Sequence, residues 1–387
     1  MKSKVLIRIG ASLFVLLLAS VSELCAQSYT VIDIGALSGG SIIVKKINQS
    51  GDLVGQSGHR YGPNTHAFVR KGGKLLNLGT LPGGDYSGAF DINKRGAVVG
   101  DSNTATVIRA FLWDASGGMQ DLGTLPGDNA SRAFGINDSD QVVGYSSGPR
   151  GVTAFVWKKS TGMASLGRLP GGDASEAVDI NNAGSVVGDS TIGSGDRHAF
   201  LWTPGTGMQD LGTLAGDDTS KAHKINDAGD VIGFALGPKG TRAFLWTSSG
   251  GMQSLGTLGG DFSDAFDLNN RGEVVGTSTS AQGAHAFHWS SGTGMRDLNT
   301  LIPSTLGVVL TSAIGINNAG LIVAIGVVSA DANRPLDTDD THGHAGQTHA
   351  FLLTPLSGPS AQSSPVVLVA DANKLGGHDN ASDALCD

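Results

Sequence analysis

Oxygen-bearing side chains recur in this sequence at spacings that suggest metal binding. The segment DINNAGSVVGDS begins like a calcium loop, with Asp179 and Asn181 at its first and third positions. A calcium loop also needs an oxygen ligand at its fifth position and a bidentate Glu at its twelfth. Those positions hold Ala183 and Ser190. The calcium interpretation therefore fails, and the Asn and Gly of this segment need another explanation.

The densest group of carboxylates and imidazoles lies where an internal repeat is interrupted, at residues 329–349. Long loops on rigid scaffolds often carry function, and Asp and His together suit a divalent ion such as Ca²⁺ or Zn²⁺. A solvated insertion that binds no ion would have the same composition. The candidate metal ligands are Asp337, Asp339, Asp340, His342 and His344.

A second set of oxygen ligands recurs once per repeat, in turns of the form LPGGD. If the repeats form a closed ring, these side chains would surround one mouth of its central channel, where they could bind a cation or a hydroxyl-rich ligand. Alternatively, short Asp and Asn side chains cap the backbone of their own turns. The rim candidates are Asp85, Asn129, Asp173, Asp218 and Asp261.

Two weaker patterns give no catalytic candidate. GYSSG matches the nucleophile-elbow motif around Ser146, but that motif needs a turn from strand to helix, whereas here strand follows strand. Histidine precedes Ala-Phe at His66, His198, His285 and His349, yet Arg or Thr takes this place in other repeats. We therefore expect strand-end packing there, and apart from Ca²⁺ or Zn²⁺ we expect no cofactor.

The composition and the N-terminus indicate an exported protein with many turns. Gly accounts for 59 of 387 residues, and only 16% of residues are charged. Residues 1–26 have the pattern of a signal peptide, with Lys2, Lys4 and Arg8 ahead of a short apolar run. A mature chain that starts at Gln27 would be periplasmic or extracellular.

The expected mature chain is acidic and lacks a disulfide. Loss of the leader changes the net charge from −8 to about −10, and no basic cluster is present, which disfavours a nucleic-acid partner. Cys386 would be the only cysteine left, so stability must come from packing. We expect a monomer with no membrane span.

The strongest feature of the sequence is a repeat of about 44 residues, which lies in the range of four-stranded propeller blades. Each copy holds four short apolar segments separated by turn residues, as expected for strands. One Asn recurs in every copy, and Gly follows it three residues later except in one copy, where Asp140 stands. This spacing predicts a type I turn that ends in a left-handed residue. The repeated Asn occurs at positions 48, 93, 137, 181, 226, 269 and 317.

Strand counting predicts an all-β protein, a seven-bladed β-propeller with four antiparallel strands per blade. The segment SYTVIDIGAL (28–37) matches the last strand of a blade, which the final repeat lacks. Pairing of the two would close the ring without an exposed edge, whereas an open solenoid would need polar caps. The propeller would span residues 27–355, followed by a Ser/Gly/Asp-rich tail at 356–387. Within that tail, PVVLVA (365–370) could compete for the closing position.

Several motifs of the repeat carry a family resemblance. HAFLW, HAFVR and HAFLL, together with DLGTLPGGD and INNAGxVVG, resemble the HAF family of bacterial extracellular repeats. The resemblance covers nearly everything from residue 29 to 355. It implies a secreted, propeller-type protein without an established activity. Some members carry a C-terminal sorting helix or a translocator barrel, whereas residues 356–387 hold no membrane-length segment.

Two classes of function follow from these patterns. Near-equivalent repeats favour a non-enzymatic binding module for an extracellular glycan, matrix component or protein, because an active site needs a unique constellation of residues. The alternative is a secreted hydrolase or lyase with a metal-assisted site at the channel mouth and the insertion in the last repeat. No base–nucleophile pair is visible in the sequence, so no catalytic residue is assigned.

Overall fold

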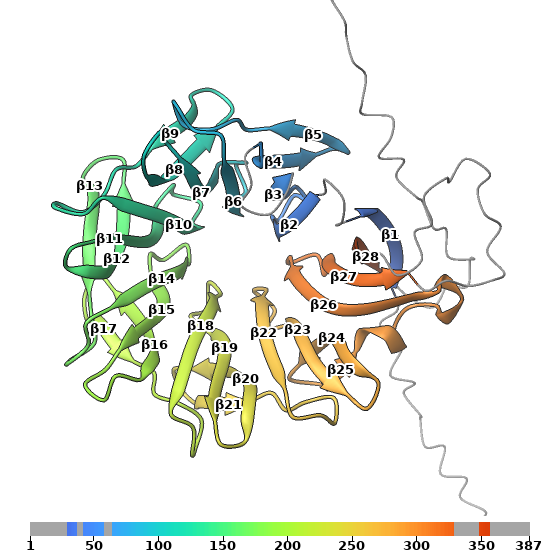
Figure 1. The fold of residues 1–387 in the computed structure, drawn as a ribbon. Helices are drawn as coiled ribbons and strands as arrows, with labels where there is room; N and C mark the ends of the chain where they lie inside the picture. The colour runs from blue at the N-terminus through green and yellow to red at the C-terminus, as the bar shows by residue number, and fades with distance from the viewer. Residues whose placement is uncertain (1–28, 37–41, 58–63, 329–347, 357–387) are drawn as a thin grey trace, which may run out of the picture.

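Seven four-stranded antiparallel sheets are arranged as blades around a central axis (Figure 1). The computed structural model describes residues 29–36, 42–57, 64–328 and 348–356. The protein is an all-β, seven-bladed β-propeller, which confirms the fold predicted from the sequence. Besides strands, the described residues form two 3₁₀ turns, η1 (Leu298–Thr300) and η2 (Ser304–Leu306).

Each blade begins with two inner strands, of which the first lies next to the channel (Figure 1). The innermost strands are β2 (Ile42–Ile47), β6 (Ser87–Ile92), β10 (Ala130–Ile136), β14 (Ser175–Ile180), β18 (Thr219–Ile225), β22 (Ser263–Leu268) and β26 (Val308–Ile316). The second strands are β3 (Leu53–Ser57), β7 (Val98–Asn103), β11 (Val142–Gly148), β15 (Val186–Thr191), β19 (Val231–Gly237), β23 (Val274–Ser280) and β27 (Ile322–Val328).

The two outer strands complete each blade. The third strands are β4 (His66–Lys71), β8 (Ile108–Asp114), β12 (Gly151–Lys158), β16 (Arg197–Thr203), β20 (Gly240–Thr247), β24 (Gly283–Ser290) and β28 (Thr348–Pro355). The outermost strands are β5 (Lys74–Asn77), β9 (Gly118–Asp121), β13 (Gly162–Gly167), β17 (Gly207–Asp210), β21 (Gly251–Ser254), β25 (Gly294–Asp297) and β1 (Tyr29–Ala36).

The N-terminal strand closes the ring. β1 is the outermost strand of the blade formed by β26, β27 and β28, and it pairs antiparallel with β28, so that Tyr29 lies opposite Pro355. This is the closure predicted from strand counting. Residues 365–370, the leader at 1–26 and the tail from 357 onward lie outside the described residues.

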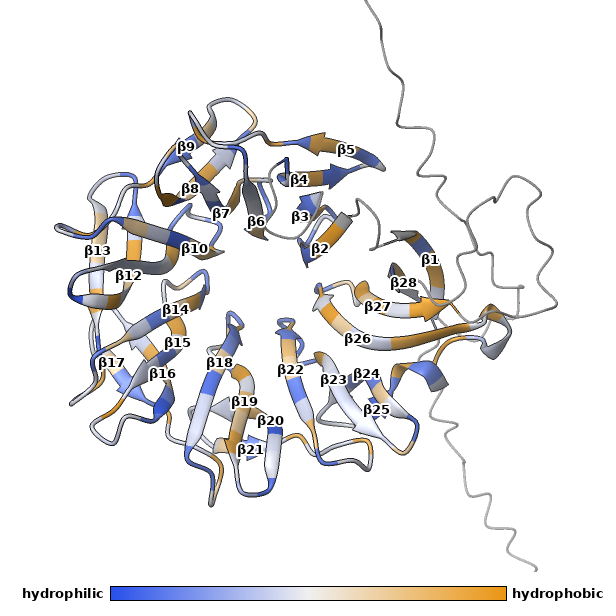
Figure 2. Ribbon diagram, viewed as in Figure 1, coloured by the Kyte–Doolittle hydropathy of each residue, from blue (hydrophilic) through white to orange (hydrophobic). Residues whose placement is uncertain are grey.

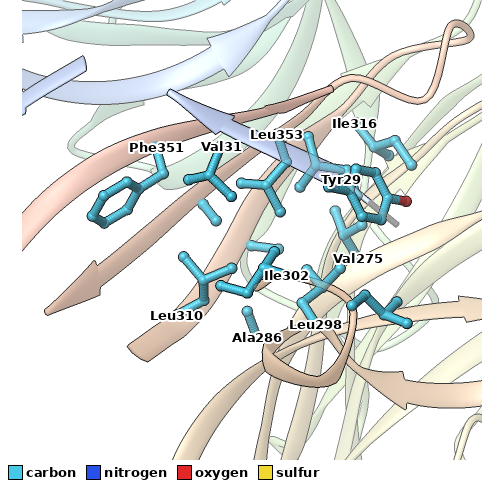
Figure 3. Close-up of a cluster of buried hydrophobic side chains, with 14 of the residues drawn as sticks. Tyr29, Val31, Val275, Ala286, Leu298, Ile302, Leu310, Ile316, Phe351 and Leu353 are labelled. Carbon is cyan, nitrogen blue, oxygen red and sulfur yellow. The ribbon is translucent and has the colours of Figure 1, made fainter. Parts of the chain in front are cut away.

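Buried apolar clusters lie between neighbouring blades, while hydrophilic residues gather at the turns (Figure 2). At the closing interface, Tyr29 and Val31 of β1 pack in one cluster with Leu310 of the same blade and with Val275 and Ala286 of the preceding blade (Figure 3). Burial of such side chains contributes roughly 1.5–3 kcal/mol each. Because each blade buries apolar area against its two neighbours, packing holds the described ring together, and the described residues contain no cysteine.

One Gly–Phe pair recurs at the centre of six blades, and in the blade closed by β1 Phe351 lies opposite Ala324 instead. In the second blade, Gly100 of β7 lies opposite Phe111 of β8, and the Phe111 ring is fully buried. A Cβ at Gly100 would lie 1.8 Å from the carbonyl oxygen of Gly88 on the inner strand. Only glycine allows this approach of two backbones, which explains the final residue of the repeated VVG motif.

Every inner strand also carries a β-bulge. In β6 the register with β7 shifts between Ala89 and Asp91. The other six inner strands shift at the equivalent position. A bulge inserts one residue and redirects the side chain that follows it. The residue after each bulge lies two positions before the repeated Asn, at the end of the strand that reaches the channel.

Candidate functional site

The hairpin turn after each innermost strand is built on the repeated Asn. In the fourth blade, the Asn181 side-chain Oδ1 accepts hydrogen bonds from the backbone N–H of Ala183 (3.1 Å) and Ser185 (2.9 Å). Gly184 donates its N–H to the Asn181 carbonyl at 3.0 Å and adopts the left-handed conformation, with φ of +80°. In the third blade, Asp140 takes the place of this Gly and also adopts the left-handed conformation, with φ of +56°. The predicted turn that ends in a left-handed residue is therefore confirmed by its geometry.

The same seven Asn residues, called here the asparagine ring, link all blades in a circle. Each side-chain Nδ2 donates a hydrogen bond to the backbone carbonyl of the equivalent Asn in the next blade. The N···O distances are 3.1 Å for Asn48 to Asn93, 3.1 Å for Asn93 to Asn137, 3.0 Å for Asn137 to Asn181, 3.0 Å for Asn181 to Asn226, 3.4 Å for Asn226 to Asn269, 3.1 Å for Asn269 to Asn317 and 3.2 Å for Asn317 to Asn48. The last link joins the two ends of the propeller.

The residue after each ring Asn forms a second circle, which we call the mouth residues: Gln49, Lys94, Asp138, Asn182, Asp227, Asn270 and Asn318. In six of the seven blades the backbone N–H of one mouth residue donates to the side-chain oxygen of the next, at 2.8–3.1 Å. Lys94 has no acceptor to offer, and its ammonium pairs with Asp138 at 3.1 Å. Most of these side chains are exposed, so they present a polar surface with fixed geometry.

Asp227 is the most heavily hydrogen-bonded carboxylate of the mouth. It accepts from the backbone N–H (3.1 Å) and Nδ2 (3.2 Å) of Asn182 and from Nδ2 of Asn270 (2.8 Å). Partial burial alone would raise its pKa, but these hydrogen bonds outweigh burial and hold the pKa below its ordinary value. The mouth therefore carries an ionised carboxylate at neutral pH.

The residues redirected by the bulges point charges into the channel. This set, called here the channel residues, comprises Lys46, Asp91, Gly135, Asp179, Lys224, Asp267 and Gly315. Two ion pairs form within it, Lys46 with Asp267 at 2.5 Å and Lys224 with Asp179 at 2.7 Å. Each Asp also uses Oδ2 to accept the backbone N–H of an Ile in the next blade, such as Ile225 for Asp179 at 2.9 Å.

The buried ammonium of Lys224 stays protonated. Burial alone would lower the pKa of Lys224, but the negative charges of Asp179, Asp91 and Asp267 outweigh burial and hold the pKa above its ordinary value. The two ion pairs, Lys46–Asp267 and Lys224–Asp179, thus connect different blades by charge, in addition to the hydrogen bonds of the asparagine ring.

A cavity of about 340 Å³ lies at this end of the channel. All seven mouth residues line it, together with six of the seven ring asparagines. From the channel residues it is lined by Lys46, Asp91, Lys224 and Asp267, and one Ile or Leu from every blade completes the wall. Its volume falls at the lower end of the range typical of small-ligand sites.

The rim candidates lie at the other end of the innermost strands and do not line this cavity. Asp85, for example, precedes β6 and accepts a hydrogen bond from Nδ2 of Asn103 at 2.6 Å. Asp173 and Asp261 accept from Thr191 (2.9 Å) and Thr279 (3.4 Å) in the same way. Asn129 and Asp218 use their backbone N–H groups to bond the second strand, at 3.0 and 3.1 Å. These bonds run to the second strand of the same blade and not to the backbone of the turn itself, so turn capping and a ligand role both stay predictions for the five residues.

The His residues before Ala-Phe have defined partners on the neighbouring outer strand. His198 bonds Asp210 at 2.9 Å, and His285 bonds Asp297 at 2.6 Å. Arg109, which replaces His in the second blade, lies 3.7 Å from Asp121 at the equivalent position. An acidic residue at this position can therefore bond either His or Arg, whereas His66 bonds Asn77 and Arg242 pairs with Asp217 instead.

The remaining candidates give no catalytic or metal site in the described chain. The Ser146 hydroxyl is buried, donates to Asp128 at 2.8 Å and accepts from the N–H of Leu125 at 3.0 Å, so it stabilises a turn. The proposed metal ligands Asp337, Asp339, Asp340, His342 and His344 lie outside the described residues. Within those residues, no group of three or more His, Cys, Asp or Glu is arranged to hold a metal ion. The same residues include no helix long and apolar enough to cross a membrane.

Sequence reasoning missed the channel residues, although a signal was present. Their position alternates between Asp, Lys and Gly among the repeats, which suggested an optional site. The informative feature is that each Lys has an Asp one or two repeats earlier around the ring, as in Asp179 and Lys224. Only a closed ring shows that Lys46 and Asp267 satisfy the same rule.

Comparison with protein-family models and with curated proteins found no match. Among solved structures, the chain is similar to an oligogalacturonate lyase from Vibrio parahaemolyticus, with 10% identity, a TM-score of 0.51 and coverage of 84% of this chain and 97% of that one. It is also similar to TolB from Acinetobacter baumannii (12% identity, TM-score 0.43, 64% of this chain and 63% of that one). A third is dipeptidyl peptidase 4 from Porphyromonas gingivalis (12% identity, TM-score 0.42, 75% and 51%).

The similarity to the lyase supports the fold alone, because the identity is low. The chain also spans less than two thirds of the TolB chain and about half of the peptidase chain. The resemblance to HAF repeats stays a prediction from the sequence.

Proposed function

We propose that this protein is a secreted, non-enzymatic binding protein of the HAF-repeat type whose ligand site is the channel mouth. The observation that carries this proposal is the cavity of about 340 Å³ surrounded by all seven mouth residues. Their amide, carboxylate and ammonium groups offer both donors and acceptors. A hydroxyl group needs both, so the ligand class that fits best is an extracellular glycan.

The rigidity of the mouth supports binding. Six of its side chains are held by hydrogen bonds from the preceding blade, so little side-chain freedom is lost when a ligand binds. The Ile and Leu side chains in the wall, such as Ile180 and Leu268, add apolar surface for the C–H faces of a sugar ring.

The chemistry of the wall also favours binding over nucleophilic catalysis. The described residues that line the cavity are Asn, Asp, Gln, Lys, Ile and Leu, with no Ser, Thr, Cys, Tyr or His among them. Nucleophilic catalysis generally needs a hydroxyl or thiol next to a base, or an activated Lys or carboxylate. Here Lys46 and Lys224 are each paired with a carboxylate, which leaves neither as a free nucleophile.

Binding is tested on the purified chain with a glycan array, followed by calorimetry on the glycans that bind. The double variant Asn182→Ala/Asp227→Ala removes two adjacent mouth side chains and is expected to weaken binding at least about tenfold, since several polar contacts are lost. Asp196→Asn, in the exposed turn between β15 and β16, is the matched control. Unchanged affinity in the double variant, or turnover of a bound glycan, would contradict the proposal.

Export is tested separately by following the chain in the producing cell. Because residues 1–26 have the signal-peptide pattern, we expect a mature N-terminus at Gln27 and protein in the periplasm or medium. Mass spectrometry of fractionated cells measures both. Protein that keeps residues 1–26 and stays in the cytoplasm would overturn the secreted location but not the binding site.

A further inference from the structure

The channel contains one more carboxylate than ammonium groups. Lys46 pairs with Asp267, and Lys224 pairs with Asp179. The third carboxylate, Asp91, forms no ion pair within the described part of the chain. The channel residues therefore carry an unmatched negative charge when all five charged groups are ionised.

Asp91 repeats the local geometry of Asp267. Asp267 accepts the N–H of Ile316 with Oδ2 (2.7 Å) and receives the Lys46 ammonium on Oδ1 (2.5 Å). Asp91 likewise accepts the N–H of Ile136 with Oδ2, at 3.0 Å. Its Oδ1, the atom equivalent to the one that binds Lys46, has no hydrogen-bond partner among the described residues.

The neighbouring blades explain why no ammonium forms an ion pair with Asp91, although its charge acts on Lys224 over a longer distance. Asp267 is followed in the next blade by Gly315, and Lys46 reaches it from the blade beyond. Asp91 is followed by Gly135, but the blade beyond carries Asp179, which already holds Lys224. The Asp–Gly arrangement thus occurs at two places in the ring. Among the described residues, an ammonium reaches the Asp only at Asp267, where Lys46 supplies it.

Asp91 is both buried and directed at the cavity. Asp91 is only 5% exposed, and it lines the cavity described above. A buried carboxylate is costly unless a cation or several donors compensate it. An open cavity beside this carboxylate lets a ligand supply that cation.

We propose that Asp91 binds a primary ammonium group of the ligand, in the manner in which Asp267 binds the ammonium of Lys46. The inference rests on the proposed glycan-binding function and makes it more specific. The preferred ligand is a glycan with a free amino sugar, whose ammonium enters the channel while its hydroxyl groups contact the mouth residues. An N-acetylated amino sugar has no charge to offer and binds less tightly.

The test compares two oligosaccharides of equal length by calorimetry, one built from glucosamine and one from N-acetylglucosamine. We expect the free amine to bind at least about tenfold more tightly, since a hydrogen bond between charged groups is a strong one. Asp91→Asn keeps an acceptor for the Ile136 N–H but removes the charge, so it should abolish this preference. Asp196→Asn should retain it.

The outcomes separate this inference from the function on which it rests. Equal affinity for both oligosaccharides, with no change in Asp91→Asn, overturns the ammonium site and leaves glycan binding intact. Binding of neither oligosaccharide, nor of any glycan on the array, contradicts both. A calcium ion that binds alone and depends on Asp91, without preference for the amine, also overturns the inference.

Protein stability provides a second measurement on the same variant. If Asp91 serves a ligand, Asp91→Asn should melt close to the temperature of the unaltered protein, because relief of a buried charge without an ion pair offsets the lost attraction for Lys224. Asp267→Asn should melt lower, because it leaves Lys46 without its partner. A marked loss of stability in Asp91→Asn would mean that this carboxylate is structural and would overturn the inference.

Discussion

The two ends of the innermost strands use similar residues for different purposes. At one end, Asn181 bonds its own turn and also the carbonyl of Asn226 in the next blade. At the other end, Asp173 bonds Thr191 of the adjacent strand in its own blade. Both positions recur around the ring with short polar side chains. The first couples blades, whereas the second links the two inner strands of one blade.

This difference explains why one position keeps its residue type and the other varies. An amide is needed in the asparagine ring because the same side chain must accept from its turn with Oδ1 and donate to its neighbour with Nδ2. Asp lacks the donor and Ser lacks the reach. At the LPGGD position an acceptor for one side chain of the second strand is enough, as in Asp85, Asp173 and Asp261, and the position holds Ser, Asn or Asp.

The largest expected effect comes from breaking one link of the asparagine ring. Asn181→Ala removes the acceptor for two partly buried N–H groups and the donor to Asn226, so we expect a loss of about 3 kcal/mol in the free energy of unfolding. Asp173→Ala, the matched change at the other end, should cost less than about 1 kcal/mol. Denaturant unfolding measures both, and equal losses would remove the distinction between the two ends.

The link that closes the circle gives a sharper version of this comparison. Asn317→Ala breaks the hydrogen bond to Asn48, 269 residues away in the sequence. If the ring is continuous, this change should cost about 2–3 kcal/mol, close to the effect at Asn181. A cost below about 1 kcal/mol would indicate that the first and last blades separate easily and that β1 alone maintains the closure.

A smaller effect of opposite sign, a gain in stability, is expected from a change within one innermost strand. Burial raises the pKa of Asp264, in β22, to about 6, while His223 of the neighbouring blade opposes the shift. A raised folded-state pKa means that ionisation destabilises the fold as the pH rises from about 4 to 7. Asp264→Asn should therefore stabilise the protein at pH 7 by about 1–3 kcal/mol, with the gain lost near pH 4. A gain that does not depend on pH would exclude this cause.

Most of the fold could be predicted from local features. The 44-residue period and the short apolar segments predicted the blades, and the Asn–Gly spacing predicted the turn that Gly184 and Asp140 adopt. These features depend on residues close in the sequence. The segment at 28–37 also predicted closure, because it matched a strand that the final repeat lacked.

Much less of the candidate site could be predicted. The LPGGD turns were expected to surround a ligand site, yet the cavity lies at the other end of the strands. The sequence shows that both kinds of turn recur, but it does not show at which end of the innermost strands a cavity forms. The local hydrogen bonds of the rim candidates do not test a ligand role, which stays a prediction.

The sequence by itself determined the units: the strands, the turns, the number of blades and the residue that closes each hairpin. Tertiary structure alone decided how those units meet. Lys46 and Asp267 are far apart in the chain, and each is ordinary in its own repeat. They become an ion pair because closure of the ring makes their blades near neighbours, and the same closure leaves Asp91 without a cation.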